Sequence, residues 1–320
     1  MVSVAMCTYN GEKFIKAQLE SILAQTHVPD EIIICDDCSQ DSTIDIVSSI
    51  LKSWNGRYKI IVNQSNLGFK RNFAKAISLC TGDIIFLADQ DDVWESCKIN
   101  VISKIFQNHN DISLIFHDVV IVDEKLNIMA SSFWQRLHFD YQVINHGQYN
   151  RLLYSNIVQG SACAFRKEVC ESAIPFYPQA IHDEWIALNS LLHGRIYAVP
   201  MKLNKYRQSG SNALGAVSIS DKVIKWLSNI NHSLDNYFRE SLRRYQVLKM
   251  FRKKKAVYES QYINYKIFDN YLSFFKRKIV YLNEKNIKLI FMIPDYMLNA
   301  PTVWWGIRMY CEDLLLFIKR

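Results

Sequence analysis

Short apolar segments alternate with polar, helix-spaced segments over the first hundred residues. Four of the apolar segments are long enough for buried strands and too short for helices: 2–7, 32–35, 58–62 and 84–87. In the stretches that follow them, such as 15–23, apolar residues recur three or four positions apart, as in amphipathic helices. This pattern predicts an α/β fold with a mainly parallel sheet and helices on both faces.

The pattern weakens after residue 94 and changes again near residue 216. We expect helices at 94–108 and 182–192, and strands at 113–116, 119–122, 160–165, 196–199 and 203–206. Residues 128–150 look irregular and aromatic. From about residue 220, Lys, Arg and aromatic residues rise, and apolar residues sit three or four apart. We therefore divide the chain into a domain at 1–215 and a basic, aromatic-rich helical extension at 216–320.

The net charge of +7 is concentrated in this extension. Residues 1–220 carry 19 Lys and Arg against 22 Asp and Glu, whereas residues 221–320 carry 19 against 9. A basic tail indicates an anionic partner. Basic amphipathic helices suit an anionic membrane surface, and a helical cap or an oligomer contact is the alternative. The run Lys253-Lys254-Lys255 comes without a nucleic-acid recognition motif, so we expect no nucleic-acid partner.

Apolar runs and cysteines bear on the expected location of the protein. The longest uninterrupted runs are short, such as Leu314 to Ile318, far below the roughly 20 residues of a spanning helix. The chain begins with a strand-like segment and no signal-peptide layout. Eight scattered cysteines are typical of reduced thiols, so we expect a cytoplasmic protein, peripheral at the inner membrane. The C-x-x-C pattern at Cys35 and Cys38 leaves a redox pair or half a zinc site as an alternative.

The strongest candidate for chemistry is the acidic stretch after the predicted strand at 84–87. Asp89, Asp91 and Asp92 follow that strand directly, at the sheet edge where open α/β folds bind ligands. Carboxylates gathered in this way suit a hard divalent cation, Mg²⁺ or Mn²⁺, that also grips substrate phosphates. An ordinary acidic turn is the alternative interpretation.

Several short motifs together resemble a known family. The motifs are Thr8-Tyr9-Asn10, the run from Asp36 to Thr43, Asn66-x-Gly68, and the stretch from Asp89 to Trp94. Over about residues 1–212 the sequence resembles family 2 glycosyltransferases of the GT-A fold. The stretch from Asp89 to Trp94, with Tyr206-Arg207-Gln208, is most similar to rhamnosyltransferase-type members from bacteria.

The resemblance implies a nucleotide sugar donor, carrying dTDP or UDP, and a saccharide or lipid-linked acceptor. The metal would bind at Asp91 with Asp89 nearby, and Asp37 would hydrogen-bond the nucleobase. The other residues that the resemblance assigns to donor binding are Thr8, Tyr9, Asn10, Asp36, Asn66, Gly68, Asn72, Gln90 and Arg207, the last for the pyrophosphate. Helix capping is the alternative for Asp36 and Asp37, and Asn10 is also a good N-cap for the helix that follows.

The reaction also needs a base, because an acceptor hydroxyl is a weak nucleophile until it loses its proton. In the family an Asp near the start of a late helix has this role, which points to Asp183 in His182-Asp183-Glu184-Trp185. Glu184 is the alternative base, and capping of the helix is the alternative role for Asp183. Where many relatives have His after Arg-Gln, this chain has Ser209, which leaves any role of that position open.

These observations predict an inverting, metal-dependent glycosyltransferase that moves rhamnose or a similar sugar during synthesis of bacterial surface polysaccharide or lipooligosaccharide. Two rivals remain. A nucleotidyltransferase would favour a Gly-rich basic loop after the first strand, which residues 8–13 lack. A non-catalytic relative would use the same residues to bind a nucleotide sugar without turnover.

Overall fold

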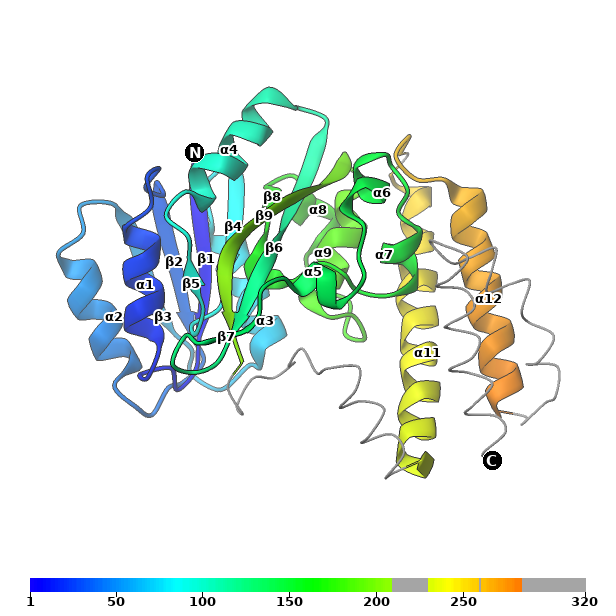
Figure 1. Cartoon of the computed structure of the whole chain (residues 1–320), viewed down its shortest axis with the longest axis horizontal. Helices are drawn as coiled ribbons and strands as arrows, with labels where there is room; N and C mark the ends of the chain where they lie inside the picture. Colours follow the sequence, from blue (N-terminus) through cyan, green and yellow to red (C-terminus); the bar gives the residue numbers. More distant parts are fainter. Residues whose placement is uncertain (209–229, 259, 284–320) are drawn as a thin grey trace. The chain divides into compact units, whose positions relative to one another are not determined.

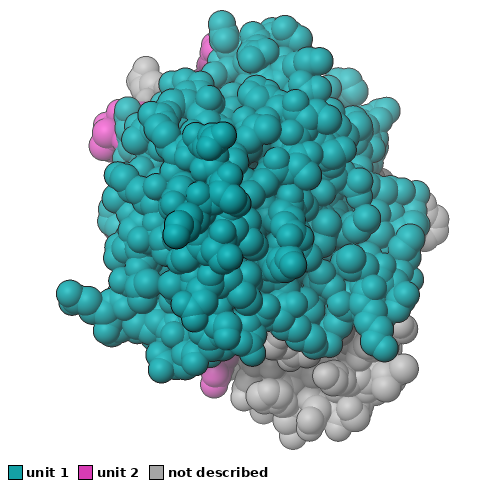
Figure 2. Space-filling view, turned by 90° about the vertical axis from the view of Figure 1, so that its left-hand side faces the viewer, with its two compact units in different colours: residues 1–147, 158–176, 181–215 teal, residues 148–157, 177–180, 216–320 magenta. Residues whose placement is uncertain are grey.

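The computed structural model describes residues 1–208, 230–258 and 260–283. Its contacts divide the chain into two compact units, coloured teal and magenta in Figure 2. Unit 1 comprises residues 1–147, 158–176 and 181–215, and unit 2 comprises residues 148–157, 177–180 and 216–320.

Unit 1 is built on a nine-stranded sheet with the order β3-β2-β1-β4-β8-β6-β9-β5, and β7 pairs with β6 beside this path. The strands are β1 (Val2–Thr8), β2 (Glu31–Asp36), β3 (Arg57–Val62), β4 (Ile84–Ala88), β5 (Val93–Trp94), β6 (Ile112–Val122), β7 (Ile128–Ala130), β8 (Cys163–Arg166) and β9 (Arg195–Arg207). The helices of this unit are α1 (Ile15–Leu23), α2 (Thr43–Lys52), α3 (Phe69–Leu79), α4 (Lys98–Asn108), α5 (Phe133–Arg136), α6 (Tyr141–Asn145), α8 (Val169–Ala173) and α9 (His182–Ser190), with the 3₁₀ turn η1 (Gly160–Ala162).

The first four strands pair in parallel, which confirms the predicted α/β class. Right-handed crossovers from β1 to β2 and from β2 to β3 place α1 and α2 on one face, where they pack together (Figure 1). The crossover from β3 back to β4 runs in the other direction and places α3 on the opposite face, against β1 and β2. Strands covered on both faces explain why their sequences are apolar without alternation.

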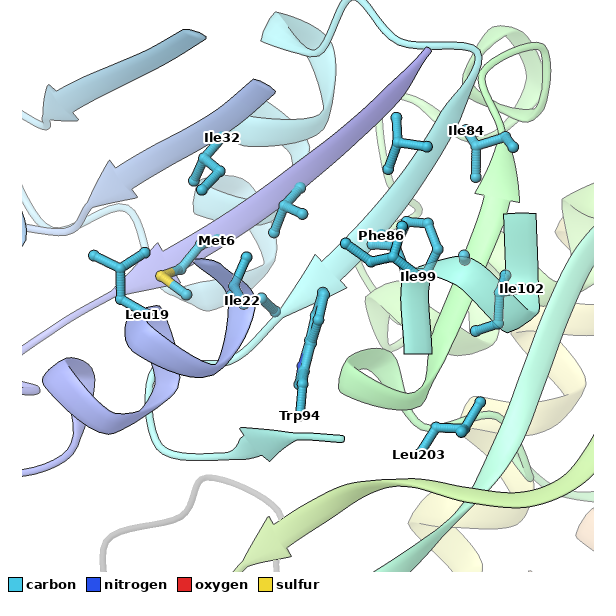
Figure 3. Close-up of a cluster of buried hydrophobic side chains, with 14 of the residues drawn as sticks. Met6, Leu19, Ile22, Ile32, Ile84, Phe86, Trp94, Ile99, Ile102 and Leu203 are labelled. Atoms are coloured by element: carbon cyan, nitrogen blue, oxygen red, sulfur yellow. The ribbon is translucent and has the colours of Figure 1, made fainter. Parts of the chain in front are cut away.

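The main hydrophobic core lies between the parallel strands and the helices α1, α2 and α4 (Figure 3). Alternate residues of β1 and β4, such as Met6 and Phe86, point into it and meet Leu19 and Ile22 of α1. Trp94, the residue that ends β5 after the acidic loop, is buried in this core with its ring 5.9 Å from that of Phe86.

The second half of the sheet is mixed, which the sequence did not indicate. β8 pairs antiparallel with both β4 and β6, and β9 pairs parallel with β6 and antiparallel with β5. β6 and β9 are single long strands where two shorter strands were predicted in each region. Register shifts near Asp118 interrupt their pairing without ending it, because an irregularity can absorb extra residues within a ladder.

The aromatic segment from β7 to α6 is fastened at two points. The Asp118 carboxylate accepts hydrogen bonds from Ser132 Oγ at 2.6 Å and from the Trp134 backbone amide at 3.0 Å. At the other end, the Asn145 side chain exchanges two hydrogen bonds with the Ala198 backbone. The segment predicted to be irregular therefore contains the short helices α5 and α6, which hydrogen bonds attach to β6 and β9.

Unit 2 is helical in its described part, as predicted for the extension. It contains α7 (Asn150–Tyr154), α11 (Ile230–Lys253), the 3₁₀ turn η2 (Lys254–Ala256) and α12 (Tyr265–Asn283). Phe251 of α11 packs on Phe268 of α12, and the buried Arg244 side chain donates to the backbone carbonyls of Leu152 and Leu153. The tail beyond residue 283, with Cys311, and the segment 209–229, with Trp226, lie outside the described residues. In the described part of the chain, no helix combines the length and apolar character needed to cross a bilayer.

Candidate active site

Three neighbouring parallel strands end at one edge of the sheet. The register aligns Thr8 at the end of β1 with Asp36 at the end of β2, and Met6 with Ala88 at the end of β4. The loops that leave these strands therefore meet, and they carry most of the polar residues that the sequence singled out.

The loops after β1 and β4 are tied together by an amide side chain. Gln90 Oε1 accepts from the Tyr9 backbone amide at 2.8 Å, and Gln90 Nε2 donates to the Tyr9 carbonyl at 3.0 Å. Gly11 leaves room for this pair, because a Cβ there would come within 2.3 Å of Gln90 Oε1. The Tyr9 side chain remains 49 % exposed and available at the sheet edge.

Asp36 and Asp37 are buried and hydrogen-bonded within the loops. Asp36 accepts from Thr8 Oγ1 at 2.7 Å and from the Ser39 backbone amide at 2.8 Å. Asp37 accepts from Asn63 Nδ2 at 2.9 Å. The interpretation of both as helix caps was wrong, because it is Asp41 that accepts from the amide of Thr43 at the start of α2.

The turn after β3 is built on the Asp37 carboxylate. The backbone amides of Leu67 and Gly68 donate to it at 2.7 and 2.8 Å. Asn66 Oδ1 also accepts from the Gly68 amide, and Gly68 has a φ of +78°, which favours glycine. The buried Asn72 side chain donates to the Cys35 carbonyl at 2.8 Å and accepts from Asn63. These residues shape the loop in which the donor-binding residues were predicted.

Asn10 does not cap α1, contrary to expectation. The helix begins at Ile15 with Phe14 at the cap position and no side-chain cap. Asn10 instead adopts a φ of +47° and accepts from the Gln40 backbone amide at 2.8 Å. Its amide oxygen thus joins the loop after β1 to the loop after β2, since Asn tolerates this conformation better than most residues.

The acidic loop contains carboxylates in two different environments. Asp92 is fully buried and accepts from Asn204 Nδ2 at 2.9 Å and from the Arg207 backbone amide at 3.0 Å. Asp89 and Asp91 are half-buried, and no side chain or other residue in the described part of the chain donates a hydrogen bond to either carboxylate. Burial raises the pKa of Asp91 to about 7, with the Asp92 charge adding to it, and burial and its acidic neighbours raise the pKa of Asp89.

Asp183, the predicted base, lies close enough to this loop for its charge to raise the pKa of Asp89. It stands in the first turn of α9, where its Oδ2 accepts from the Gly160 backbone amide at 3.1 Å and its Oδ1 accepts from the Glu184 amide. Glu184 is fully buried, and its carboxylate accepts from the Ile181 amide to cap the helix. The capping role therefore falls to Glu184, and Asp183 is the carboxylate whose charge acts on Asp89 of the acidic loop.

Arg207 braces the acidic loop from the end of β9. Its Nε donates to the Asp91 carbonyl at 2.6 Å, and its Nη1 donates to the Glu124 carbonyl. The guanidinium also lies 4.5 Å from the centre of the Phe14 ring. The structure thus shows a bracing role for Arg207, and its contact with a pyrophosphate stays a prediction.

Sequence reasoning missed three polar residues that the fold buries around this site. Lys98 is fully buried, its Nζ donates to the Ser161 carbonyl at 2.6 Å, and burial lowers its pKa to about 7. Asn204 is buried beside Asp92, and His182 stacks on Phe73 at 4.5 Å next to Asp183. The polar Asn204 within a predicted strand could have indicated a buried polar contact. Lys98, in contrast, looks in the sequence like an ordinary exposed residue at the start of a helix.

The donor set of the acidic loop fits a divalent cation that substrate oxygens complete. Asp89 and Asp91 offer carboxylate oxygens that accept no hydrogen bond from another described residue. Burial and then acidic neighbours raise the pKa values of both groups, so a cation would stabilise their ionised forms. No group of three His, Cys, Asp or Glu side chains within the described ranges could hold a metal. Mg²⁺ often takes only one or two protein carboxylates and shares substrate phosphates, so this arrangement suits such a site.

The cysteines give no support to a redox or zinc site. All seven cysteines in the described part of the chain are free. Burial raises the pKa of Cys35 to about 11, which disfavours the reactive thiolate, and Cys38 Sγ lies 2.8 Å from the Asn63 carbonyl.

Comparison with known proteins identifies relatives of this chain. The family model described as glycosyl transferase family 2 matches residues 3–173. An uncharacterised glycosyltransferase of Nostoc sp. PCC 7120 is 28 % identical over 66 % of this chain and 66 % of its own length. An Escherichia coli enzyme named UDP-Glc:α-D-GlcNAc-diphosphoundecaprenol β-1,3-glucosyltransferase is 31 % identical over 38 % of this chain and 47 % of its own length. The chain thus spans less than two thirds of these relatives.

Solved structures share the fold at low sequence identity. Staphylococcus aureus TarS (residues 1–349), solved with UDP-GlcNAc, has a TM-score of 0.59 at 15 % identity, covering 93 % of this chain and 81 % of its own. A mannosyltransferase from Pyrobaculum calidifontis, solved with GDP-Man and Mn²⁺, has a TM-score of 0.53 at 15 % identity, covering 98 % and 79 %. These likenesses establish the GT-A fold.

Proposed function

The chain belongs to glycosyltransferase family 2, and on that premise we propose that it transfers a sugar from a nucleoside diphosphate donor to a saccharide hydroxyl. One observation carries the proposal. Asp89 and Asp91, two carboxylates that accept no hydrogen bond from another described residue, follow β4 at the carboxyl edge of the parallel strands, and the Asp183 charge acts on Asp89. This arrangement provides a cation-binding pair beside a candidate base.

Asp183 supplies the acid–base step in this proposal. The acceptor oxygen forms a bond to the anomeric carbon while the bond from that carbon to the diphosphate oxygen breaks. Asp183 takes the acceptor proton, and attack opposite the leaving group inverts the anomeric centre. A divalent cation held by Asp89 and Asp91 would neutralise the charge of the departing diphosphate.

We propose a dTDP- or UDP-linked hexose such as rhamnose as the donor, and a saccharide or lipid-linked acceptor of bacterial surface polysaccharide. TarS, which binds UDP-GlcNAc, and the E. coli enzyme named for UDP-Glc support the UDP form of this proposal. The P. calidifontis enzyme, solved with Mn²⁺ and GDP-Man, supports the metal. The family match disfavours a nucleotidyltransferase, and turnover by the wild-type chain would exclude a non-catalytic relative.

Thermal melting with a panel of nucleotide sugars tests the donor class. We expect one nucleotide class, combined with Mn²⁺, to raise the melting temperature, because a ligand that binds only the folded state stabilises it by about 2.7 kcal/mol at 100 times its Kd. Mn²⁺ alone and the matching nucleoside monophosphate serve as controls. No stabilisation by any UDP-, dTDP- or GDP-sugar with metal would contradict the proposal.

We also propose that unit 2 binds an anionic membrane surface through the end of α11 and the turn that follows. Lys249, Lys253 and Lys255 are exposed there, together with Met250 and Val257, the latter 78 % exposed. Exposed apolar residues among lysines are typical of segments that lie on anionic bilayers. Such contact would hold the enzyme near a lipid-linked acceptor.

Vesicle co-sedimentation of the full chain tests the membrane proposal. Changing both Lys253 and Lys255 to Gln should weaken binding to phosphatidylserine vesicles about 30-fold, because each lysine contributes about 1 kcal/mol near an anionic surface. The matched control changes the exposed Lys52 and Lys59 of unit 1 to Gln and should bind like wild type. Equal binding to neutral phosphatidylcholine vesicles, or an unchanged double variant, would favour the helical-cap or oligomer interpretation.

A further inference from the structure

Lys98 occupies an environment in which lysine is rare. It is the first residue of α4, and its side chain is fully buried, near enough to Asp92 and Asp89 for their charges to act on it. Its Nζ donates to the Ser161 carbonyl at 2.6 Å and lies 3.7 Å from the centre of the Trp94 ring. A buried amino group with one short, directed hydrogen bond fixes the position of its acceptor.

The acceptor belongs to η1, the turn that connects the two halves of the candidate site. On one side, the Gly160 backbone amide donates to Asp183 Oδ2. On the other side, Asn204 Nδ2 lies 3.2 Å from Ser161 Oγ and 2.9 Å from Asp92 Oδ2. A shift of this turn would therefore move the candidate base and the support of the acidic loop together.

The turn is also packed closely at Gly160. A Cβ on Gly160 would come within 2.8 Å of His182 Nε2 and 3.7 Å of Asp183 Oδ2, so the backbone already packs against both side chains. The His182 ring is itself fixed by stacking on Phe73. Close packing at Gly160 and the hydrogen bond from Lys98 to the Ser161 carbonyl thus both restrict the position of the turn.

We propose that Lys98 is a positioning residue that acts through Ser161 and η1 to hold the Asp183 carboxylate in place near Asp89. This inference rests on the proposed transferase function for its kinetic consequence. Its structural consequence, a fixed hydrogen bond from Gly160 to Asp183, holds whatever the substrate.

Replacing Lys98 with Met tests the proposal with little change in volume. The thioether can occupy the same space against Trp94, because sulfur packs well on aromatic rings, but it cannot donate to Ser161. We expect the backbone amide of Gly160 to exchange its hydrogen at least 10-fold faster in Lys98→Met. We expect kcat to fall about 10- to 100-fold, since small misplacement of a catalytic group has effects of that size.

Donor affinity should change little in the same variant. The loops after β1 and β4 keep their own ties through Gln90 and Arg207, so the KM for the donor should stay within threefold of wild type. The matched control is Lys104→Met, an exposed lysine on the same helix, which should leave both exchange and kinetics unchanged.

Each outcome decides the matter. Unchanged exchange at Gly160 overturns the proposal, and so does faster exchange spread evenly over unit 1, which would mean a general loss of stability. A fall in donor affinity equal to the fall in kcat also overturns it. If the wild-type protein transfers no sugar, the proposed function fails, while the exchange measurement still decides whether Lys98 positions Asp183.

Discussion

Changing Asp183 to Asn should remove sugar transfer and leave the protein folded. General base catalysis contributes about 10²- to 10⁴-fold, so we expect kcat to fall within that range. The Asn side chain keeps one oxygen for the Glu184 amide but loses the ability to take a proton. Turnover with the donor found by thermal melting measures the effect, and circular dichroism checks the fold.

The neighbouring carboxylate provides the control for this prediction. Glu184→Gln retains an oxygen that can accept from the Ile181 amide, so the helix cap persists and kcat should stay within a few-fold of wild type. If Glu184→Gln loses activity and Asp183→Asn keeps it, the base is Glu184. Undiminished transfer by both variants would refute the proposed acid–base step.

Changing Asp91 to Asn should abolish the response to metal while stabilising the metal-free protein. The variant loses one of two cation-binding carboxylates, so stabilisation by Mn²⁺ with donor should disappear and kcat/KM should fall about 10³-fold, or several kcal/mol. Without metal, however, the ionised Asp91 carboxylate is unfavourable in the fold, because burial and Asp92 raise its pKa to about 7.

The stabilisation expected for the metal-free Asp91→Asn protein should increase with pH. Between the ordinary pKa of 3.8 and the folded value of about 7, the folded protein binds more protons at Asp91 than the unfolded chain does. The contribution of Asp91 to the free energy of unfolding of the wild-type protein therefore falls as pH rises from 3.8 to about 7, and it stays low at higher pH. The metal-free melting temperature of Asp91→Asn should exceed that of wild type by an amount that grows from pH 4 to 7.

Asp83→Asn is the matched control, since Asp83 lies just before the other end of β4 and its side chain is 78 % exposed. It should retain the full metal response. An Asp91→Asn protein that is still stabilised by Mn²⁺ with donor would contradict the metal assignment. A variant that melts below wild type without metal at pH 8 would contradict the raised pKa of Asp91.

The sequence predicted the parallel half of the sheet because each of its strands is buried on both faces and reads as an apolar run. The mixed half was not predictable in the same way. The pairing of β8 with β4 joins residues such as Ile85 and Phe165, and no local pattern encodes a partner so distant in the chain. The register shifts in β6 and β9 looked like strand ends because polar residues interrupt the runs there.

The candidate site was predictable where chemistry shows in short motifs. Asp89, Asp91 and Asp183 were found in that way, and their roles remain predictions. The structure adds that most other residues assigned to the donor, including Asp37 and Gln90, have their side chains engaged in joining loops. Lys98 escaped notice because its burial depends on Ser161 and Trp94, which only the folded chain brings to it.

The way in which the aromatic segment after β7 is fastened has a practical consequence for engineering. Its hydrogen-bonded attachments lie at Asp118 and at Asn145 with Ala198, and the Trp134 and Phe139 rings also pack against Phe116 of β6. An exchange of this stretch among relatives should therefore preserve the fold only if both attachments and the aromatic contact with Phe116 are copied. Melting temperatures of chimaeras cut at these points would measure how much the aromatic contact adds to stability.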